Sequence, residues 1–364
     1  MGIVKTDDSR REEIEEFRTM LLACAAVHRR KDYDPPRARR PLLYGDSPDP
    51  LSSPVCVTSG ISYLGRAVVN RLLLRGYSVR VMVDNQEDLE KLREMETAGE
   101  MGGALNNFRA VVAKLSDVGS LAAAFDGCRG VFHTASFADP SGLSGYSKSM
   151  AEIEVKTTES VMEACARTPS VRNSVLTSSL LACIWRDHTR NHSSPIINHE
   201  SWSDEPYCLR NKLWYALGKL RAERAAWRIA KERGLRLTAI CPGLITGPEF
   251  CNRNPTATIA YLKGAKEMYA LGLLATVDAM KLADAHVSVF EEMGESEASG
   301  RYICYDHVVD EEKADKLARQ SGMPIDRIRG EAVTAGIRPQ LKLSNRKLSY
   351  LLMRNSSGSC RDES

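Results

Sequence analysis

The order of apolar and polar positions changes at residue 55. From there, short apolar runs alternate with segments in which apolar residues recur every three or four positions. This alternation is typical of a parallel sheet covered by helices. It predicts strands over 55–58, 78–83, 108–112, 130–133, 174–178 and 237–241, and helices over 64–75, 88–95, 118–125, 146–166 and 213–233. The predicted fold is an α/β doubly wound parallel sheet of the Rossmann type, which binds ligands at the carboxyl ends of its strands.

The segment before residue 55 has a different pattern. Residues 7–30 begin with Ser9 and Glu12 at capping-box spacing and continue with an apolar stripe, which predicts a helix. Residues 31–54 contain six prolines, a density that excludes both a helix and a central strand. We therefore expect an N-terminal helix and a Pro-rich linker over residues 1–54.

The 364 residues divide further after the predicted sheet. Residues 55–245 are expected to form the Rossmann domain, a fold class that binds dinucleotides such as NAD(P), and residues 246–348 mainly a small lobe that covers its ligand crevice. The last segment, 349–364, ends NSSGSCRDES and is expected to be a disordered tail.

Charge and composition exclude several classes of function. Lys and Arg number 50 and Asp and Glu 47, so the net charge of +3 predicts no nucleic-acid partner. No apolar run reaches the roughly 20 residues that span a bilayer, and a secretory signal is missing. Gly2 fits a loose N-myristoylation pattern near basic residues, but acidic residues oppose it, so we expect a cytoplasmic protein without a membrane anchor. The ten cysteines show no metal-ligand spacing, which predicts reduced thiols and no metal site.

A tight turn, in VCVTSGISYLG, joins the first predicted strand to the first predicted helix. A dinucleotide pyrophosphate binds at such a helix N-terminus, where glycines let the backbone approach the phosphates. The reductase motif Thr-Gly-x-x-Gly-x-x-Gly has serines here in place of its first two glycines, with Gly60 following the first serine. The candidate cofactor-binding residues of the turn are Thr58, Ser59, Gly60, Ser62, Tyr63, Leu64 and Gly65.

Asp84 ends the second predicted strand, where an acidic residue binds the hydroxyls of the adenosine ribose. A carboxylate there disfavours a 2′-phosphate, so Asp84 favours NAD(H) over NADP(H). The alternative is that Asp84 only opens the next turn, an ordinary position for aspartate.

Three residues are candidates for proton chemistry. Tyr215 and Lys219 stand four apart on a predicted helix and therefore share one face. An ammonium beside a phenol stabilises the phenolate, so the two together can transfer a proton. Ser179 follows the fifth predicted strand, where its hydroxyl can hold a substrate carbonyl oxygen while Tyr215 protonates it.

From about Val55 to Leu348 the chain resembles the extended short-chain dehydrogenases/reductases, and most closely the plant cinnamoyl-CoA reductase and dihydroflavonol reductase group. The motifs that carry the resemblance are VCVTSGISYLG, LLLRGYSVR, DGCRGVFHTAS, VLTSS, ESWSD, LWYALGK, RLTAICPGLITGP, DAMKLADAHVSVFEE and GRYIC. The resemblance implies a Ser179-Tyr215-Lys219 triad, NADP(H) as cofactor, and a carbonyl or acyl-CoA thioester substrate. It also implies cofactor contacts from Lys114, Leu115, Thr134, Ala135, Ser136, Pro242, Gly243, Leu244 and Ile245.

Departures from the family pattern fall on both the cofactor side and the substrate side. Asp84 stands where the family has a cofactor-binding arginine, and Lys114 stands where the family has an aspartate. Leu213, Ala216 and Leu217 replace the Asn, Cys and second Tyr of the cinnamoyl-CoA reductase helix, and Ile184 replaces the substrate-binding Asn of dihydroflavonol reductases. These changes argue against a lignin or flavonoid substrate. Two alternatives to a reductase are a catalytically weak protein that acts as a nucleotide sensor or scaffold, and a sugar-nucleotide epimerase of the same fold.

Overall fold

The computed structural model describes residues 53–90, 107–134, 146–187, 195–248, 250–295, 298–330 and 341–358. Its centre is a seven-stranded parallel sheet in the order β3-β2-β1-β4-β5-β7-β10. The strands are β1 (Val55–Thr58), β2 (Val79–Val83), β3 (Phe108–Val112), β4 (Gly130–His133), β5 (Asn173–Thr177), β7 (Arg236–Pro242) and β10 (Gly300–Cys304). The order reverses between β1 and β4, which is where a doubly wound sheet opens its ligand crevice.

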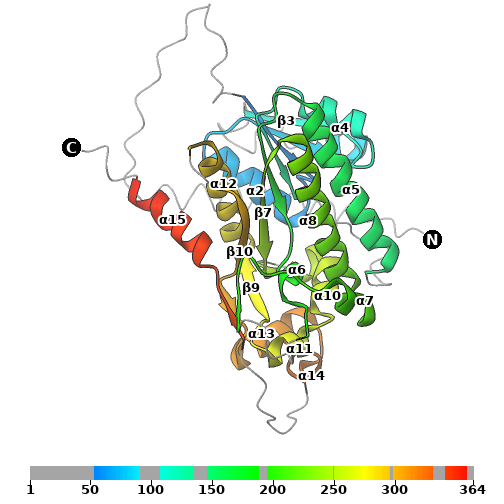
Figure 1. The fold of residues 1–364 in the computed structure, drawn as a ribbon, viewed down its shortest axis with the longest axis vertical. Coiled ribbons are helices and arrows are strands. Elements are labelled where there is room, and N and C mark those ends of the chain that lie inside the picture. The colour runs from blue at the N-terminus through cyan, green and yellow to red at the C-terminus, as the bar shows by residue number, and fades with distance from the viewer. Residues whose placement is uncertain are drawn as a thin grey trace, which may run out of the picture.

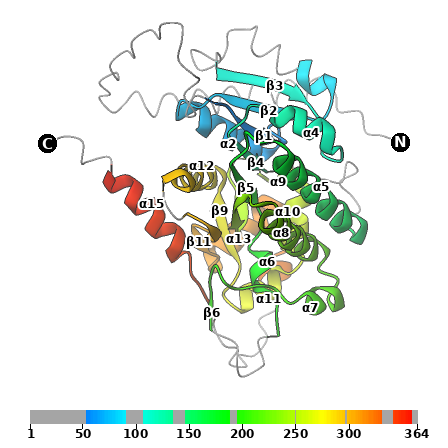
Figure 2. The same cartoon turned by 45° about the horizontal axis from the view of Figure 1, so that its top comes forward.

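Helices cover both faces of this sheet (Figures 1 and 2). On one face lie α2 (Tyr63–Leu74) and α12 (Ala279–Glu295), and on the other lie α4 (Val118–Phe125), α5 (Lys148–Arg167) and α8 (Trp214–Arg233). Every residue of β1 and β4 is buried as a result. The predicted doubly wound fold is therefore confirmed, and the six predicted strands agree with the structure to within one residue at each end.

Short elements lie beyond the carboxyl edge of the sheet, where Figure 1 shows β9, α10, α11, α13 and α14. They include two small sheets, in the orders β11-β9-β8 and β12-β6. The short strands are β6 (Ile196–Ile197), β8 (Leu244–Thr246), β9 (Ala275–Asp278), β11 (His307–Val308) and β12 (Lys342–Leu343). The short helices are α6 (Leu181–Ile184), α7 (Glu205–Arg210), α9 (Phe250–Arg253), α10 (Pro255–Leu262), α11 (Ala265–Ala270), α13 (Glu311–Ser321) and α14 (Ile325–Arg329).

The C-terminal part differs from the sequence prediction in two ways. Strand β10 joins the main sheet beside β7 and α12 packs on α2, so only part of residues 246–348 lies apart from the sheet. A helix, α15 (Arg346–Gly358), also replaces most of the predicted tail. Leu348 and Leu351 are buried, and the helix packs against α12 and β10. This apolar contact stabilises a helix where the composition of the last residues suggests none.

Residues 1–52 lie outside the described residues, and with them the predicted N-terminal helix, Gly2 and nearly all of the Pro-rich linker. In the part of the chain that is described, no helix combines the length and the apolar character needed to cross a membrane. The eight cysteines in that part are all free thiols.

Candidate active site

The turn between β1 and α2 is closely packed although two of its expected glycines are serines. Ser59 has a φ of 50°, the left-handed region that the first glycine of the motif usually occupies. A Cβ atom on Gly60 would lie 2.3 Å from Val81 Cγ1, and one on Gly65 would lie 2.2 Å from the Ser59 carbonyl oxygen. Gly60 and Gly65 are therefore required by packing, whereas Ser59 carries the unusual backbone conformation.

Ser62 begins α2 as its N-cap. Its Oγ accepts a hydrogen bond from the Gly65 amide at 3.1 Å, and the first turn of the helix contains no acidic residue. A helix N-terminus without acidic side chains, beside a turn where two Cβ atoms would clash, fits the pyrophosphate of a dinucleotide. The residues present in this structure are thus compatible with a nicotinamide cofactor.

The ends of β1 and β4 are tied together at the point where the strand order reverses. Thr134 donates a hydrogen bond from Oγ1 to the Thr58 carbonyl at 2.6 Å, and Thr58 Oγ1 lies 3.0 Å from His133 Nδ1. Burial and the nearby Lys219 lower the pKa of His133 to about 4, so this imidazole is neutral at physiological pH. Its role here is to order the crevice edge.

The remaining cofactor candidates occupy three places. Asp84 is exposed after β2, and Lys114 is exposed after β3 with half-buried Leu115 beside it. After β7, the predicted contacts are buried or half-buried: Pro242, Gly243, Leu244 and Ile245. Ala135 and Ser136 lie outside the described residues. The structure thus distributes the candidates over the carboxyl ends of β1, β2, β3, β4 and β7.

Tyr215 and Lys219 lie in the first turns of α8. The Lys219 ammonium nitrogen is 5.8 Å from the centre of the Tyr215 ring, and Lys219 is only 4% exposed. Burial alone would lower the pKa of Lys219, but the neighbouring Glu154 carboxylate raises it above its ordinary value. The structure therefore places a charged ammonium directly behind the phenol.

Glu154, on α5, is the ion-pair partner of Lys219. Its Oε1 lies 2.6 Å from Lys219 Nζ, and both side chains are 5% exposed. Its Oε2 accepts a hydrogen bond from the Tyr146 hydroxyl at 3.0 Å. The Tyr146 ring in turn meets the Tyr215 ring edge-on, with the centroids 5.0 Å apart. Sequence reasoning did not identify Glu154 or Tyr146.

Ser178 and Ser179 follow β5, but their hydroxyls have different partners. Ser178 Oγ donates to Glu223 Oε2 at 2.6 Å, deep in the protein. Ser179 Oγ accepts from the Leu181 amide at 3.2 Å, and within the described part of the chain no acceptor is found for its own hydrogen. Ser179 is therefore the serine whose hydroxyl can serve a ligand.

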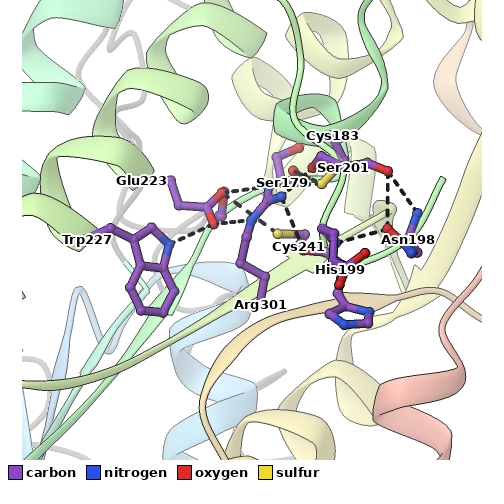
Figure 3. Close-up of polar contacts among 11 residues, drawn as sticks. Ser179, Cys183, Asn198, His199, Ser201, Glu223, Trp227, Cys241 and Arg301 are labelled. Carbon is purple, nitrogen blue, oxygen red and sulfur yellow. Dashed lines mark hydrogen bonds and ion pairs between the residues drawn. The ribbon is translucent and has the colours of Figure 1, made fainter. Parts of the chain in front are cut away.

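A buried polar network lies on the other side of α8 (Figure 3). Arg301 of β10 forms an ion pair with Glu223 at 2.6 Å and also donates to the Ser201 carbonyl. Trp227 Nε1 donates to the same carboxylate at 3.2 Å. Figure 3 shows Arg301 between Glu223 and the segment that carries Ser201. The network joins β10, α8 and the segment that carries Ser201, and Ser178 contacts it through its hydrogen bond to Glu223.

A cavity of about 460 Å³ lies beside Tyr215, which forms part of its wall. Its other lining residues are Tyr146, Leu181, Trp185, Leu213, Trp214, Ala216, Ile259, Ala260, Tyr261, Leu262, Lys263, Gly264, Met323, Pro324 and Arg327. The lining is mostly apolar and aromatic, with two cationic residues, Lys263 and Arg327. This composition is typical of a site for an apolar small molecule that carries an anionic group.

The sequence of residues 55–297 matches the profile of the NAD dependent epimerase/dehydratase family. This segment covers more than half of the chain. The chain belongs to this family. Membership confirms the predicted relationship to the extended short-chain dehydrogenases/reductases. Together with the reductases among its relatives, described next, it identifies an NAD(P)-dependent oxidoreductase.

Reductases of plants are among the relatives of this family member. It is 37% identical over 260 residues to cinnamoyl-CoA reductase 1 of Petunia hybrida, covering 70% of this chain and 73% of that protein. It is 33% identical over 286 residues to tetraketide alpha-pyrone reductase 1 of Arabidopsis thaliana, covering 76% and 84%. The resemblance to the cinnamoyl-CoA reductase group, inferred from short motifs, is thus confirmed.

Solved structures of reductases share the fold of this family member. Vestitone reductase from alfalfa (Medicago sativa) superposes with a TM-score of 0.58 at 23% identity, covering 82% of this chain and 92% of that one. Yeast methylglyoxal/isovaleraldehyde reductase, complexed with NADPH, gives a TM-score of 0.59 at 21% identity and the same coverage.

The sequence contains a pattern from which Glu154 could have been identified. The buried residues of α5 include Met150, Thr158, Val161 and Met162, and Glu154 falls on the same face, where an unpaired carboxylate would be costly. A carboxylate inside such a stripe requires a cationic partner on the facing helix. Tyr146, by contrast, lies just before α5 in a segment without periodicity, and only the structure brings it to the site.

Proposed function

We propose that the protein reduces the carbonyl carbon of an acyl-CoA thioester, with Ser179, Tyr215 and Lys219 as its catalytic residues. The observation that carries this proposal is the position of Tyr215, which lines the cavity while Lys219 stands one helical turn behind it. A phenol facing an apolar cavity and backed by a buried ammonium is equipped to protonate a developing alkoxide.

The cavity lining favours a thioester of coenzyme A over a small neutral carbonyl compound. The aromatic and aliphatic wall suits an apolar acyl group, and Lys263 and Arg327 offer positive charge to phosphate groups. Arg327 is exposed on α14, where a long polar ligand arm that leaves the cavity would meet it. The name of the Petunia relative, cinnamoyl-CoA reductase, agrees with this class of substrate.

Each catalytic side chain has a separate task. Tyr215 donates its hydroxyl proton to the substrate oxygen, and the charge of Lys219 favours the phenolate that remains. Ser179 donates a hydrogen bond to the same oxygen as negative charge develops there. When bound, the nicotinamide would supply the hydride for the carbonyl carbon. The resulting hemithioacetal then breaks its C–S bond, so that the hydroxyl proton passes to the departing coenzyme A thiolate and the aldehyde remains.

The cofactor would lie along the carboxyl ends of β1, β2 and β4. Gly60, Ser62 and Gly65 would hold its pyrophosphate at the N-terminus of α2, and Thr134 lies at the crevice edge. Asp84 is exposed after β2, where its carboxylate accepts bonds from ribose hydroxyls and repels a 2′-phosphate. We infer a preference for NAD(H) from this residue, and the structural neighbour bound to NADPH makes a direct comparison of the two cofactors necessary.

The test uses the full chain with cinnamoyl-CoA and cinnamaldehyde as probe substrates, each with NADH and with NADPH. The two probes compare a thioester with an aldehyde of the same aromatic group. Neither stands for the natural substrate, because the residues in place of the family's substrate contacts argue against a lignin or flavonoid compound. The expected result is cofactor oxidation with cinnamoyl-CoA, at a higher kcat/KM than with cinnamaldehyde and with NADH preferred. If both cofactors bind but neither probe is reduced, the reductase proposal is wrong for these substrate classes. If neither cofactor binds, the scaffold interpretation is favoured.

A further inference from the structure

Glu154 places a carboxylate inside the contact between α5 and α8, directly behind the proposed catalytic pair. Its Oε1 lies 2.6 Å from Lys219 Nζ, and each of the two side chains is 5% exposed. A buried carboxylate of this kind is costly unless it is paired and hydrogen-bonded. The Tyr146 hydroxyl supplies the further hydrogen bond, at 3.0 Å from Oε2.

The two helices come close enough for this arrangement because α8 has a glycine at the crossing. A Cβ atom on Gly218 would lie 3.1 Å from Ala151 Cα and 3.1 Å from the Tyr146 hydroxyl. Gly218 therefore allows α5 and the Tyr146 side chain to reach the Lys219 side of α8. A larger residue at position 218 would force these neighbours to move away from α8.

Tyr146 connects the carboxylate to both the cavity and Tyr215. Its ring lines the cavity and meets the Tyr215 ring edge-on, at 5.0 Å between centroids and 71° between planes. One carboxylate thus fixes the ammonium behind Tyr215 and the aromatic ring beside it. Burial, together with the Glu154 charge, raises the pKa of Tyr146 far above its ordinary value, so its hydroxyl remains a donor.

Several titratable groups lie around Glu154. From α8 it faces Lys219, from the segment before α5 it faces Tyr146, and from β4 it faces His133. Tyr215 is reached through Lys219 and through the Tyr146 ring. His133 is neutral at physiological pH because burial lowers its pKa to about 4. Glu154 therefore places a negative charge directly beside the Lys219 ammonium.

We propose that Glu154 is a positioning residue that holds the Lys219 ammonium next to Tyr215. Its charge also keeps Tyr215 and Lys219 protonated up to a higher pH than they would be without it. This inference rests on the proposed function, because it assigns Tyr215 as the proton donor. Lys219 alone would favour the phenolate strongly. Glu154 offsets that effect and keeps the phenol protonated, as a reduction requires.

The sign of the effect follows from simple electrostatics. Removing a negative charge makes every nearby proton easier to lose, whether it sits on the ammonium or on the phenol. Tyr215 and Lys219 titrate as a coupled pair, so the first proton leaves the pair at lower pH whichever residue releases it. The reaction needs that proton, and therefore the high-pH limb of the kcat/KM profile must move to lower pH.

The test compares pH profiles of kcat/KM for cinnamoyl-CoA reduction by the wild type, Glu154→Gln and Glu154→Asp. In Glu154→Gln we expect the high-pH limb to move to lower pH by about one unit or more. Glu154→Asp keeps the charge and is expected to restore most of the wild-type profile. A matched control is Glu152→Gln, an exposed residue of the same helix, which removes the same charge and should leave the profile unchanged.

Three outcomes separate this inference from the proposed function. An unshifted profile in an active Glu154→Gln variant overturns the role of Glu154 and leaves the reductase proposal intact. Wild-type protein that binds cofactor but reduces neither probe overturns the proposed function itself. If Glu154→Gln does not fold, a lysine-selective NMR titration of the wild type replaces the comparison. The inference requires Lys219 to stay charged to a higher pH than the exposed lysines. Loss of the Lys219 charge at a lower pH than theirs contradicts it.

Discussion

Helix α8 carries two buried ion pairs one turn apart, and they differ in kind. Toward α5 and the cavity, Lys219 pairs with Glu154 at 2.6 Å. Toward β10, Glu223 pairs with Arg301 at the same distance. All four side chains are almost fully buried. The N–O distance and the burial of the side chains are thus nearly the same in the two pairs and do not explain how the pairs differ.

The difference lies in the cation and in the number of partners. Arg301 stays protonated at any pH the protein survives, and Glu223 also accepts bonds from Ser178 and Trp227. Lys219, in contrast, can release its proton when its surroundings favour the neutral amine. A permanent charge with saturated partners suits a structural junction, whereas a titratable charge beside a phenol suits proton transfer.

Breaking the structural pair gives the largest expected change in stability. Glu223→Gln keeps the size of the side chain but leaves the Arg301 charge buried without a counter-ion, which costs about 3–5 kcal/mol of unfolding free energy. Denaturant unfolding monitored by circular dichroism measures this loss. Glu232→Gln, exposed on the same helix, should stay within about 0.5 kcal/mol of the wild type. A Glu223→Gln variant as stable as this control would show that Arg301 finds other compensation.

Breaking the pair at the cavity is expected to cost less stability. In Glu154→Gln, Lys219 can become neutral and avoid the penalty of a buried charge, so we expect a loss of about 1–2 kcal/mol. The same unfolding experiment, repeated at several pH values, should show the smallest difference from wild type at alkaline pH. Equal losses for Glu154→Gln and Glu223→Gln would contradict the distinction between a titratable and a permanent cation.

A single bond of the structural network has the smallest expected effect. Trp227 is half-buried, and Trp227→Phe removes its hydrogen bond to Glu223 while keeping an aromatic ring. We expect a loss of about 1 kcal/mol, with kcat and KM unchanged, because the carboxylate keeps Arg301 and Ser178. A marked change in kcat would mean that this side of α8 also serves the reaction.

Much of the fold could be predicted from the sequence because the central strands of the sheet, such as β1 and β4, are buried on both faces and read as continuous apolar runs. Strand β1 and helix α4 lie at the positions expected from apolar periodicity. Strand β10 was missed because GRYIC is short and mixed, and only its pairing with β7 defines it. Helix α15 was missed because its stability comes from contacts of Leu348 and Leu351 with distant parts of the chain.

The candidate site could be predicted where local patterns indicate it, from residue spacing within a helix or from a place at the end of a strand, as for Ser179. Tyr215 and Lys219 belong to one helix, so their spacing indicates a shared face. Glu154 and Tyr146 reach them across the α5 and α8 contact, and Arg327 reaches the cavity from α14. Such long-range contacts depend on topology, which local patterns do not encode.

The central claim is that Tyr215 is the proton donor of a reductase. The most direct measurement is the rate of cofactor oxidation with cinnamoyl-CoA, at saturating cofactor, by the wild type, Tyr215→Phe and the control Tyr269→Phe, which changes a tyrosine of α11 outside the cavity wall. We expect Tyr215→Phe to bind cofactor normally and to lose about 10² to 10⁴-fold in kcat, while the control keeps the wild-type rate. A Tyr215→Phe variant as fast as the wild type would contradict the account.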